Sequence, residues 1–494
     1  MTTRLLSHAL PAADDRPRVH FIGTMTEPSF MPGSSRHGMS ARGAGPLTMH
    51  SEAGSADERF WDSHVSGSTH GVSSPALLRR VGEFLPYVAI PVLGGLAPIM
   101  VIPAITSTQG ASVWATVAVA QSIGAGAAVV VELGWGVTGP QLVAAASPEE
   151  RRSIFAASVY SKVPVVGLGA LVSGALAFLL AGQGGLVPAL VAAGAALVAL
   201  QQSWYFVGTG RPRDALLTDT SVRVLTSAAS AAALLAGAPL LVFALLMVAQ
   251  PIASLALASL RARPRWEQPR RALSIGLAST RTQGVVTLGR SIGGVYTALP
   301  IAIVSVAAPS AVADFAALER LMRMGLTVLN SVPQSLQSWI GGSTGGERIR
   351  RTRAAVLWNA ALGVVAGTAF ALLGGPVSRL VFTGEITVSR ESTLAFALVV
   401  ALVCTSRGTG LALVGLGRAN SITVAIAVSA AVGAPAIYLL AQAFGAAGGA
   451  AGEITAEAVC LVVQLLLFRR FSRDAVEGTA APPRRRPLGR PSSA

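Results

Sequence analysis

The stretch FAALERLMRMG, Phe315 to Gly325, carries three charges inside a region that is otherwise apolar. In a helix, Arg323 lies about 40° from Glu319 and Arg320 about 60° beyond Arg323, so the three charges share one arc. Guanidinium groups bind phosphate through paired hydrogen bonds and stay charged when desolvated. The carboxylate has two readings: a site for a coupling cation, or a local partner for Arg323 one turn away.

Amides continue this arc toward the C-terminal end of the same predicted helix. Asn330, Gln334 and Gln337 return to within about 60° of Glu319. An unpaired charge at the centre of a bilayer costs about 3 kcal/mol or more, so the face should point into a bundle or a watery cavity. We predict Arg320, Arg323, Asn330 and Gln334 as substrate-binding residues.

Four further charges lie within apolar runs. Arg290 in TLGRSIGG and Arg407 in CTSRGTG are candidates for the same cavity, although Arg290 could equally extend to the membrane surface from a helix end. Glu453 and Glu457 are one turn apart in GEITAEAVC. With Glu319 they are the predicted ion-coupling residues, and the alternative for the pair is a favourable interaction with a helix N-terminus.

These residues sit in a chain of 494 residues that is 52% hydrophobic and 12% charged, a composition typical of a polytopic membrane protein. The apolar runs are continuous over about 20 residues, which predicts spanning helices and excludes alternating barrel strands. We expect an all-α fold of about 12 transmembrane helices. The predicted spans are 84–105, 113–134, 155–181, 186–208, 217–237, 239–260, 284–307, 312–340, 354–373, 392–414, 421–442 and 446–468.

Arginine distribution predicts the topology. The connections after even-numbered spans hold sixteen arginines: 151, 152, 211, 213, 223, 261, 263, 265, 270, 271, 281, 348, 350, 351, 353 and 418. The connections after odd-numbered spans hold only Arg379 and Arg390. Because basic residues concentrate on the cytoplasmic side, both chain ends are expected there.

The most basic connection, RARPRWEQPRR at 261–271, divides the membrane region near its middle. We therefore expect two six-helix lobes, 81–265 and 266–471, as in transporters built from repeats. Residues 1–80 are expected to be a disordered cytoplasmic extension and 472–494 a disordered basic tail. A Trp-Tyr pair at the end of the fourth span, Trp204 and Tyr205, is expected at the membrane interface.

Several functional classes are disfavoured. The arginines lie in short connections and the tail, which indicates anionic lipid head groups and not nucleic acid as their partner. All six histidines precede the first span, and the carboxylates form no metal site or acid/base pair, so we expect no metal, no cofactor and no enzyme activity. A nucleotide-binding loop of the G-x-x-x-x-G-K-[ST] type is lacking.

Four segments, in order along the chain, resemble one family: QQSWYFVGTGR, ADFAALERLMRMGLTVLNSVPQSLQSW, GGPVSRLVFTGE and GLGRANSITVAIAVSAAVGAPAIYLLAQAFGAAGGAAGEITAEAVCLVVQLLLFRR. From about Pro86 to Phe471 the chain is similar to the Wzx-like polysaccharide-transport branch of the multidrug/oligosaccharidyl-lipid/polysaccharide (MOP) exporter superfamily. The resemblance implies two lobes around a cavity that opens alternately to either side. It also implies cations that receive a pyrophosphate-linked sugar lipid, with Arg320 and Arg323 at the basic positions.

The first span, FLPYVAIPVLGGLAPIMVIPAI, lacks the arginine that lipid II flippases of this superfamily carry there, which argues against that subtype. The leading hypothesis is an ion-coupled flippase, driven by H⁺ or Na⁺, for a polyprenyl-pyrophosphate oligosaccharide or polysaccharide precursor. It would be a monomer in a bacterial cytoplasmic membrane, working with polysaccharide-assembly partners. The alternative is a multidrug or organic-cation antiporter of the MATE branch, which would favour a cavity of carboxylates and aromatics, whereas only 5% of residues are aromatic.

Overall fold

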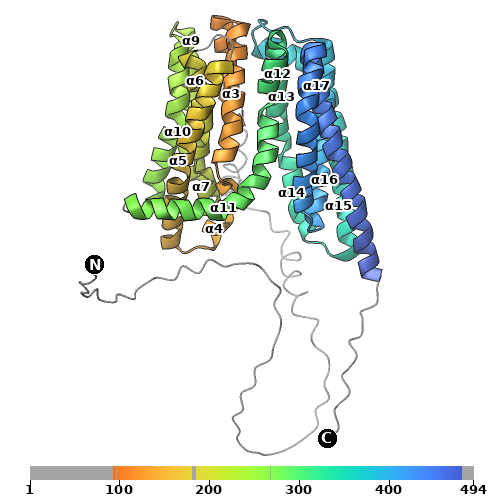
Figure 1. Ribbon diagram of the computed structural model, residues 1–494. Helices are drawn as coiled ribbons and strands as arrows, with labels where there is room; N and C mark the ends of the chain where they lie inside the picture. The colour runs from red at the N-terminus through yellow and green to blue at the C-terminus, as the bar shows by residue number, and fades with distance from the viewer. Residues whose placement is uncertain (1–92, 96, 181–184, 268, 481–494) are drawn as a thin grey trace, which may run out of the picture. The chain divides into compact units, whose positions relative to one another are not determined.

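The computed structural model describes residues 93–95, 97–180, 185–267 and 269–480, and within them it contains helices and no strand. The predicted N-terminal extension 1–80 lies outside the described residues. Helix 93–109, which passes over residue 96, opens the described part of the chain. Figure 1 shows the helices that follow in two groups.

The first group comes from the N-terminal half, where α6 packs against α3, α5 and α10, and α10 packs against α9. Its elements are α3 (Ala111–Val131), α4 (Trp135–Ala145), α5 (Pro148–Leu180), α6 (Leu186–Leu197), η1 (Val198–Leu200), α7 (Ser203–Gly208), α8 (Pro212–Ala215), η2 (Leu216–Thr220), α9 (Ser221–Leu235) and α10 (Leu240–Ala262).

The second group comes from the C-terminal half, where α16 packs against α15 and α17, and α12 packs against α17. Helix α11 (Pro269–Ala298) joins the two groups, with contacts to α3, α5 and α17. The remaining elements are α12 (Pro300–Ala307), η3 (Pro309–Ala311), α13 (Val312–Leu329), α14 (Ser331–Gly341), α15 (Gly345–Val381), α16 (Arg390–Gly415) and α17 (Asn420–Ala480).

Seven segments of the described chain are long and apolar enough to cross a membrane. They are Ala111–Val131, Pro148–Leu180, Leu186–Gly208, Leu240–Ala262, Gly345–Val381, Arg390–Gly415 and Asn420–Arg473. The last contains two predicted spans, because Gly445 has φ 60° and ψ −135° and interrupts the helix. A positive φ of this kind is accessible to glycine at little cost.

Two predicted spans are divided by breaks that apolar periodicity does not reveal. The span 312–340 becomes α13 and α14, separated at Asn330, and 284–307 becomes α11 and α12, separated at Leu299. Pro300 directly follows the second break. Proline fits the first turn of a helix but not its interior, so α12 begins at this residue. The predicted polar face beyond Arg323 therefore runs over two helices.

Two expectations at the edges of predicted spans need correction. Trp204 and Tyr205 are only 6% and 4% exposed, because they pack against Trp135 and Phe155 from α4 and α5. They are core residues and not an interfacial belt. At the C-terminal end, α17 continues to Ala480, so residues 472–480 of the predicted disordered tail are helical, and 481–494 lie outside the described residues.

Close helix contacts depend on small residues. A Cβ atom at Gly363 of α15 would lie 2.7 Å from the carbonyl oxygen of Ala401 and 3.0 Å from Cβ of Cys404, both on α16. At Gly167 of α5, by contrast, a Cβ atom would meet nothing within 4 Å. Small residues at such crossings let the helix backbones approach closely in a membrane.

We predict opposite outcomes for alanine at these two glycines. Gly363→Ala should destabilise the protein by about 1–3 kcal/mol, because the α16 backbone must move away. Gly167→Ala should be neutral or stabilising by up to about 1 kcal/mol, because alanine restricts the unfolded chain more than glycine does. Thermal unfolding of both purified variants in detergent measures the difference, and equal shifts in Tm would contradict the described packing.

Candidate functional site

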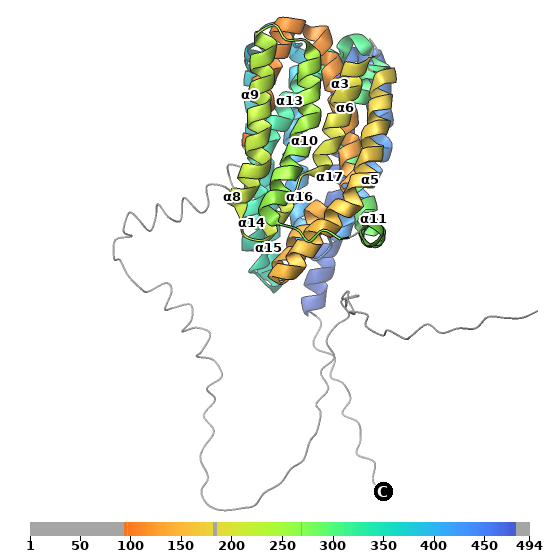
Figure 2. The same ribbon diagram turned by 90° about the vertical axis from the view of Figure 1, so that its left-hand side faces the viewer.

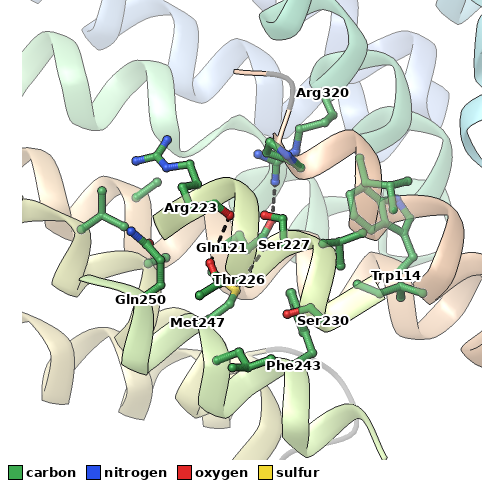
Figure 3. Close-up of a pocket in the computed structure, with 18 of the residues that line it drawn as sticks. Trp114, Gln121, Arg223, Thr226, Ser227, Ser230, Phe243, Met247, Gln250 and Arg320 are labelled. Atoms are coloured by element: carbon green, nitrogen blue, oxygen red, sulfur yellow. Dashed lines mark hydrogen bonds between the residues drawn. The ribbon is translucent and has the colours of Figure 1, made fainter. Parts of the chain in front are cut away.

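A cavity of about 340 Å³ lies among the helices of the N-terminal half. Helix 93–109, α3, α6, α9 and α10 form its walls (Figure 3), and one residue, Arg320, comes from α13 of the C-terminal half. The apolar lining residues are Pro98, Val101, Ile102, Ile105, Trp114, Ala125, Ala128, Ala195, Val198, Phe243, Leu246 and Met247. The polar ones are Gln121, Arg223, Thr226, Ser227, Ser230, Gln250 and Arg320.

Among the described lining residues there are two guanidinium groups and no carboxylate. Figure 3 shows Arg223 and Arg320 at one end of the cavity and Phe243 toward the other. An apolar pocket with a few convergent polar groups is the usual form of a small-molecule site. Within the part of the chain described, this lining favours an anionic group on the ligand.

Arg320 enters the cavity from the opposite half of the protein. Its Nη2 donates a hydrogen bond of 2.5 Å to Oε1 of Gln121 on α3. Its Nε is buried and has no hydrogen-bond partner among the described residues. A buried donor without a partner is costly, so an acceptor that reached this nitrogen would remove that cost.

Arg223 is a cavity residue that sequence reasoning placed in a connection. The structure corrects this: Arg223 lies in the first turn of α9, and its Nη2 donates a 2.9 Å hydrogen bond to Oε1 of Gln201. The π-helical turn η2 before α9 carries Asp219, which is 5% exposed and whose charge acts on Arg223. The sequence contains a signal for this interaction, because Arg223 follows Asp219 by one helical turn inside an apolar run.

A break in the fourth span supports this arrangement. Gln201 and Gln202 are non-helical between η1 and α7, which frees backbone groups at membrane depth. Lys162, the single lysine of the chain and fully buried, donates from Nζ to the carbonyl oxygen of Gln201 at 3.4 Å. Irregular backbone within a membrane requires such protein partners. Sequence analysis had assigned no role to Lys162.

A second group of charges, the carboxylate–arginine cluster, lies in the C-terminal half. Its members are Glu319, Arg323, Arg407, Glu453 and Glu457. Arg323 donates from Nε to Oε1 of Glu319; Glu319 is 4% exposed and Arg323 37%. The local pair considered from the sequence is therefore present, and it leaves Arg320 free to extend to α3.

The cluster extends from α13 to α16 and α17. Arg407 donates from Nη1 to the carbonyl oxygen of Leu326 at 3.1 Å. Glu453 interacts electrostatically with Glu319 and Arg323, and Glu457 interacts electrostatically with Arg323 and Arg407. The predicted ion-coupling residues thus lie together around Arg323.

The remaining predicted site residues are dispersed. Asn330 is the C-terminal cap of α13, with its backbone N–H bonded to the carbonyl of Leu326. The side chains of Arg290 on α11 and Gln334 on α14 lie outside the described residues. Arg323 and Arg407 belong to the carboxylate–arginine cluster and do not line the described cavity. Of the predicted substrate-binding residues, Arg320 alone is among the described lining.

The sequence matches no protein-family model and no curated protein. The fold is similar to that of an inward-facing multidrug resistance MATE family transporter of the MOP superfamily, with a TM-score of 0.54 and 14% identity over 81% of this chain and 96% of that chain. A MATE protein in the bent conformation gives 0.50 and 13%, with the same coverage of both chains. The lipid II flippase MurJ, inward closed, gives 0.52 and 11% over 81% of this chain and 91% of that chain.

These likenesses establish the fold. The predicted all-α, MATE-like architecture is confirmed, and the apolar helices indicate a multi-pass membrane protein. At identities of 11–14% they do not choose between a Wzx-like flippase and a drug transporter.

We predict that the Glu319–Arg323 pair stabilises the protein and that its two members are coupled. Glu319→Ala should cost about 2 kcal/mol, because Arg323 loses its charged hydrogen-bond partner while remaining partly solvated. Glu319→Ala with Arg323→Met should recover part of that loss, since the guanidinium that had lost its hydrogen-bond partner is then removed as well. A double-mutant cycle of thermal unfolding tests this, and additive single effects would contradict the coupling.

Proposed function

We propose that this protein is a flippase that moves a lipid-linked oligosaccharide or polysaccharide precursor, bearing a polyprenyl pyrophosphate, across the cytoplasmic membrane by ion-coupled alternating access. The observation that carries the proposal is the lining of the cavity, which contains Arg223 and Arg320 and, among its described residues, no carboxylate.

The polarity of the cavity favours an anionic substrate over an organic cation. Two guanidinium groups in apolar surroundings would repel a cationic drug and attract a pyrophosphate, because Coulomb interactions are strong where water is scarce. Arginine also matches the geometry of phosphate oxygens through paired donors. The apolar wall formed by residues such as Trp114 and Phe243 leaves room for the less polar part of the substrate.

Arg320 also offers a means of coupling substrate binding to conformational change. It belongs to α13 of the C-terminal half but is bonded to Gln121 of α3 in the N-terminal half. A phosphate that takes over the Arg320 donors competes with that bond. Binding would then weaken one link between the predicted lobes, 81–265 and 266–471, and favour their rearrangement.

The carboxylate–arginine cluster is the proposed site of ion coupling. It contains three carboxylates and two guanidinium groups, so with all groups ionised its net charge is negative and one cation or proton would neutralise it. One carboxylate oxygen of Glu453 is buried with no hydrogen-bond partner among the described residues. Ionisable residues within a membrane that face one another are typical of ion pathways. Lobe motion would link this cluster to the cavity through α13.

Replacing the cavity arginines tests the substrate assignment. Arg223→Gln and Arg320→Gln should each weaken substrate binding by about 10- to 100-fold, the value of one to two charge-assisted hydrogen bonds. Flipping of a fluorescent polyprenyl-pyrophosphate sugar in proteoliposomes is the measurement. Arg350→Gln is the matched control, because Arg350 is 80% exposed on α15.

Two results would contradict the anionic substrate. Flipping at the normal rate by both cavity variants would remove the cavity from the mechanism. Transport of an organic cation by the unsubstituted protein, abolished by Glu319→Gln, would instead establish the multidrug antiporter.

Replacing the cluster carboxylates tests ion coupling. Glu453→Gln should abolish the stimulation of flipping by an imposed H⁺ or Na⁺ gradient, because the cluster can no longer change its charge. Glu457→Gln should reduce that stimulation. Binding of the substrate should be retained, since neither residue lines the described cavity. Glu385→Gln, at an exposed position, is the control. Gradient-driven flipping that persists in both cluster variants would exclude this site.

A further inference from the structure

The N-terminal part of helix α11 runs across the end of the helix bundle instead of parallel to its helices. Figures 1 and 2 show this part nearly perpendicular to α5 and α10, at the end of the bundle where α4 lies. Its length and direction place it at the level of a membrane surface, because the spanning helices run across the bilayer.

Several contacts hold the N-terminal part of α11 and the segment directly before it, which contains Trp266 and Glu267, against α5. The backbone N–H of Glu267 donates to Oη of Tyr160 at 2.5 Å, and the ring centroids of Tyr160 and Trp266 are 5.8 Å apart. A Cβ atom at Gly276 would lie 2.9 Å from the carbonyl oxygen of Tyr160, so the two helices cross closely here. Tyrosine and tryptophan are both enriched at the membrane interface.

The residues of α11 divide into two faces. Ala272 and Gly276 are buried, and Gly276 lies against Tyr160 of α5. The opposite face, which we call the outer face of α11, spans an arc of about 120°. Its exposed members are Arg270, Arg271, Ser274, Leu277, Ala278 and Arg281.

The charge on and beside this face is strongly unbalanced. Between residues 261 and 281 the chain has six arginines and one carboxylate, Glu267. Glu267 lies 3.5 Å from Arg271, while Arg261 is paired with Asp214 at 2.8 Å. Trp266 and Leu277 are 54% and 57% exposed, so the surface offers apolar side chains beside its guanidinium groups. That mixture is typical of a helix that lies in the headgroup layer.

We propose that the outer face of α11, with Trp266, binds the anionic head groups of bilayer phospholipids. Arg270, Arg271 and Arg281 contact phosphates, while Trp266 and Leu277 insert among the upper parts of the acyl chains. Each basic residue near an anionic leaflet contributes about 1 kcal/mol, so the interaction should be selective for anionic over zwitterionic lipid. This site is separate from the cavity and does not depend on the proposed transport function.

The test measures which lipid is enriched next to α11 in the full-length protein. A fluorophore is attached at Ser274→Cys, and the protein is reconstituted in phosphatidylcholine vesicles containing a small share of either phosphatidylglycerol or phosphatidylcholine with a nitroxide near the top of one acyl chain. The native Cys404 and Cys460 are 2% and 6% exposed, so the unsubstituted protein gives the labelling background. Gln109→Cys, exposed at the end of helix 93–109 in a stretch without arginine, is the reference position.

Labelled phosphatidylglycerol should quench the fluorophore at position 274 at a lower mole fraction than labelled phosphatidylcholine does. The preference should fall about fivefold for each of Arg270→Gln, Arg271→Gln and Arg281→Gln. It should also weaken with added salt. Because these side chains are exposed, the variants should keep the Tm of the parent protein, which is measured in parallel.

Three outcomes would overturn the proposal. The first is equal quenching by the two lipids at position 274. The second is a phosphatidylglycerol preference that survives the triple substitution or is as strong at position 109. The third is the absence of quenching by either lipid, which would place the outer face in water and point to a soluble acidic partner instead.

Discussion

The free-energy cost of placing charged groups in apolar surroundings constrains this structure, and the charged residues of α13 reduce that cost by pairing. Glu319 and Arg323 satisfy each other one turn apart, which allows Arg320 to point away from them. Arg320 then reaches α3 in the other half of the chain and bonds to Gln121. The cavity and the carboxylate–arginine cluster are therefore connected through one helix, which contributes Arg320 to the cavity and Glu319 and Arg323 to the cluster.

The protein keeps its positive and negative functional groups largely apart. The described lining of the cavity has arginines without carboxylates, whereas the cluster has carboxylates in excess over arginines. This separation suits two ligands of opposite charge, an anionic lipid and a small cation. The carboxylates whose charge acts on the cavity arginines, Asp219 on Arg223 and Glu319 on Arg320, lie outside the described lining.

Breaks in the spanning helices recur where polar groups are needed. Gln201 and Gln202 interrupt one span, and the carbonyl and side chain of Gln201 meet Lys162 and Arg223. Asn330 ends α13 within another predicted span, 312–340. Interrupted helices free backbone groups that would otherwise be used within the helix, so they are favourable places for polar interactions inside a membrane.

The sequence by itself determined the all-α class, the positions of most apolar helices and the importance of the charges on α13, because apolar run length and helical spacing are local properties. The pairing of Glu319 with Arg323 was also accessible, since it spans one turn. Only the tertiary structure decided that Arg223 and Gln121 join Arg320, that Lys162 supports a broken span, and that Glu453 and Glu457 face Arg323. Those residues are far apart in the chain, and their meeting depends on how the helices pack and where they break, which local spacing does not encode.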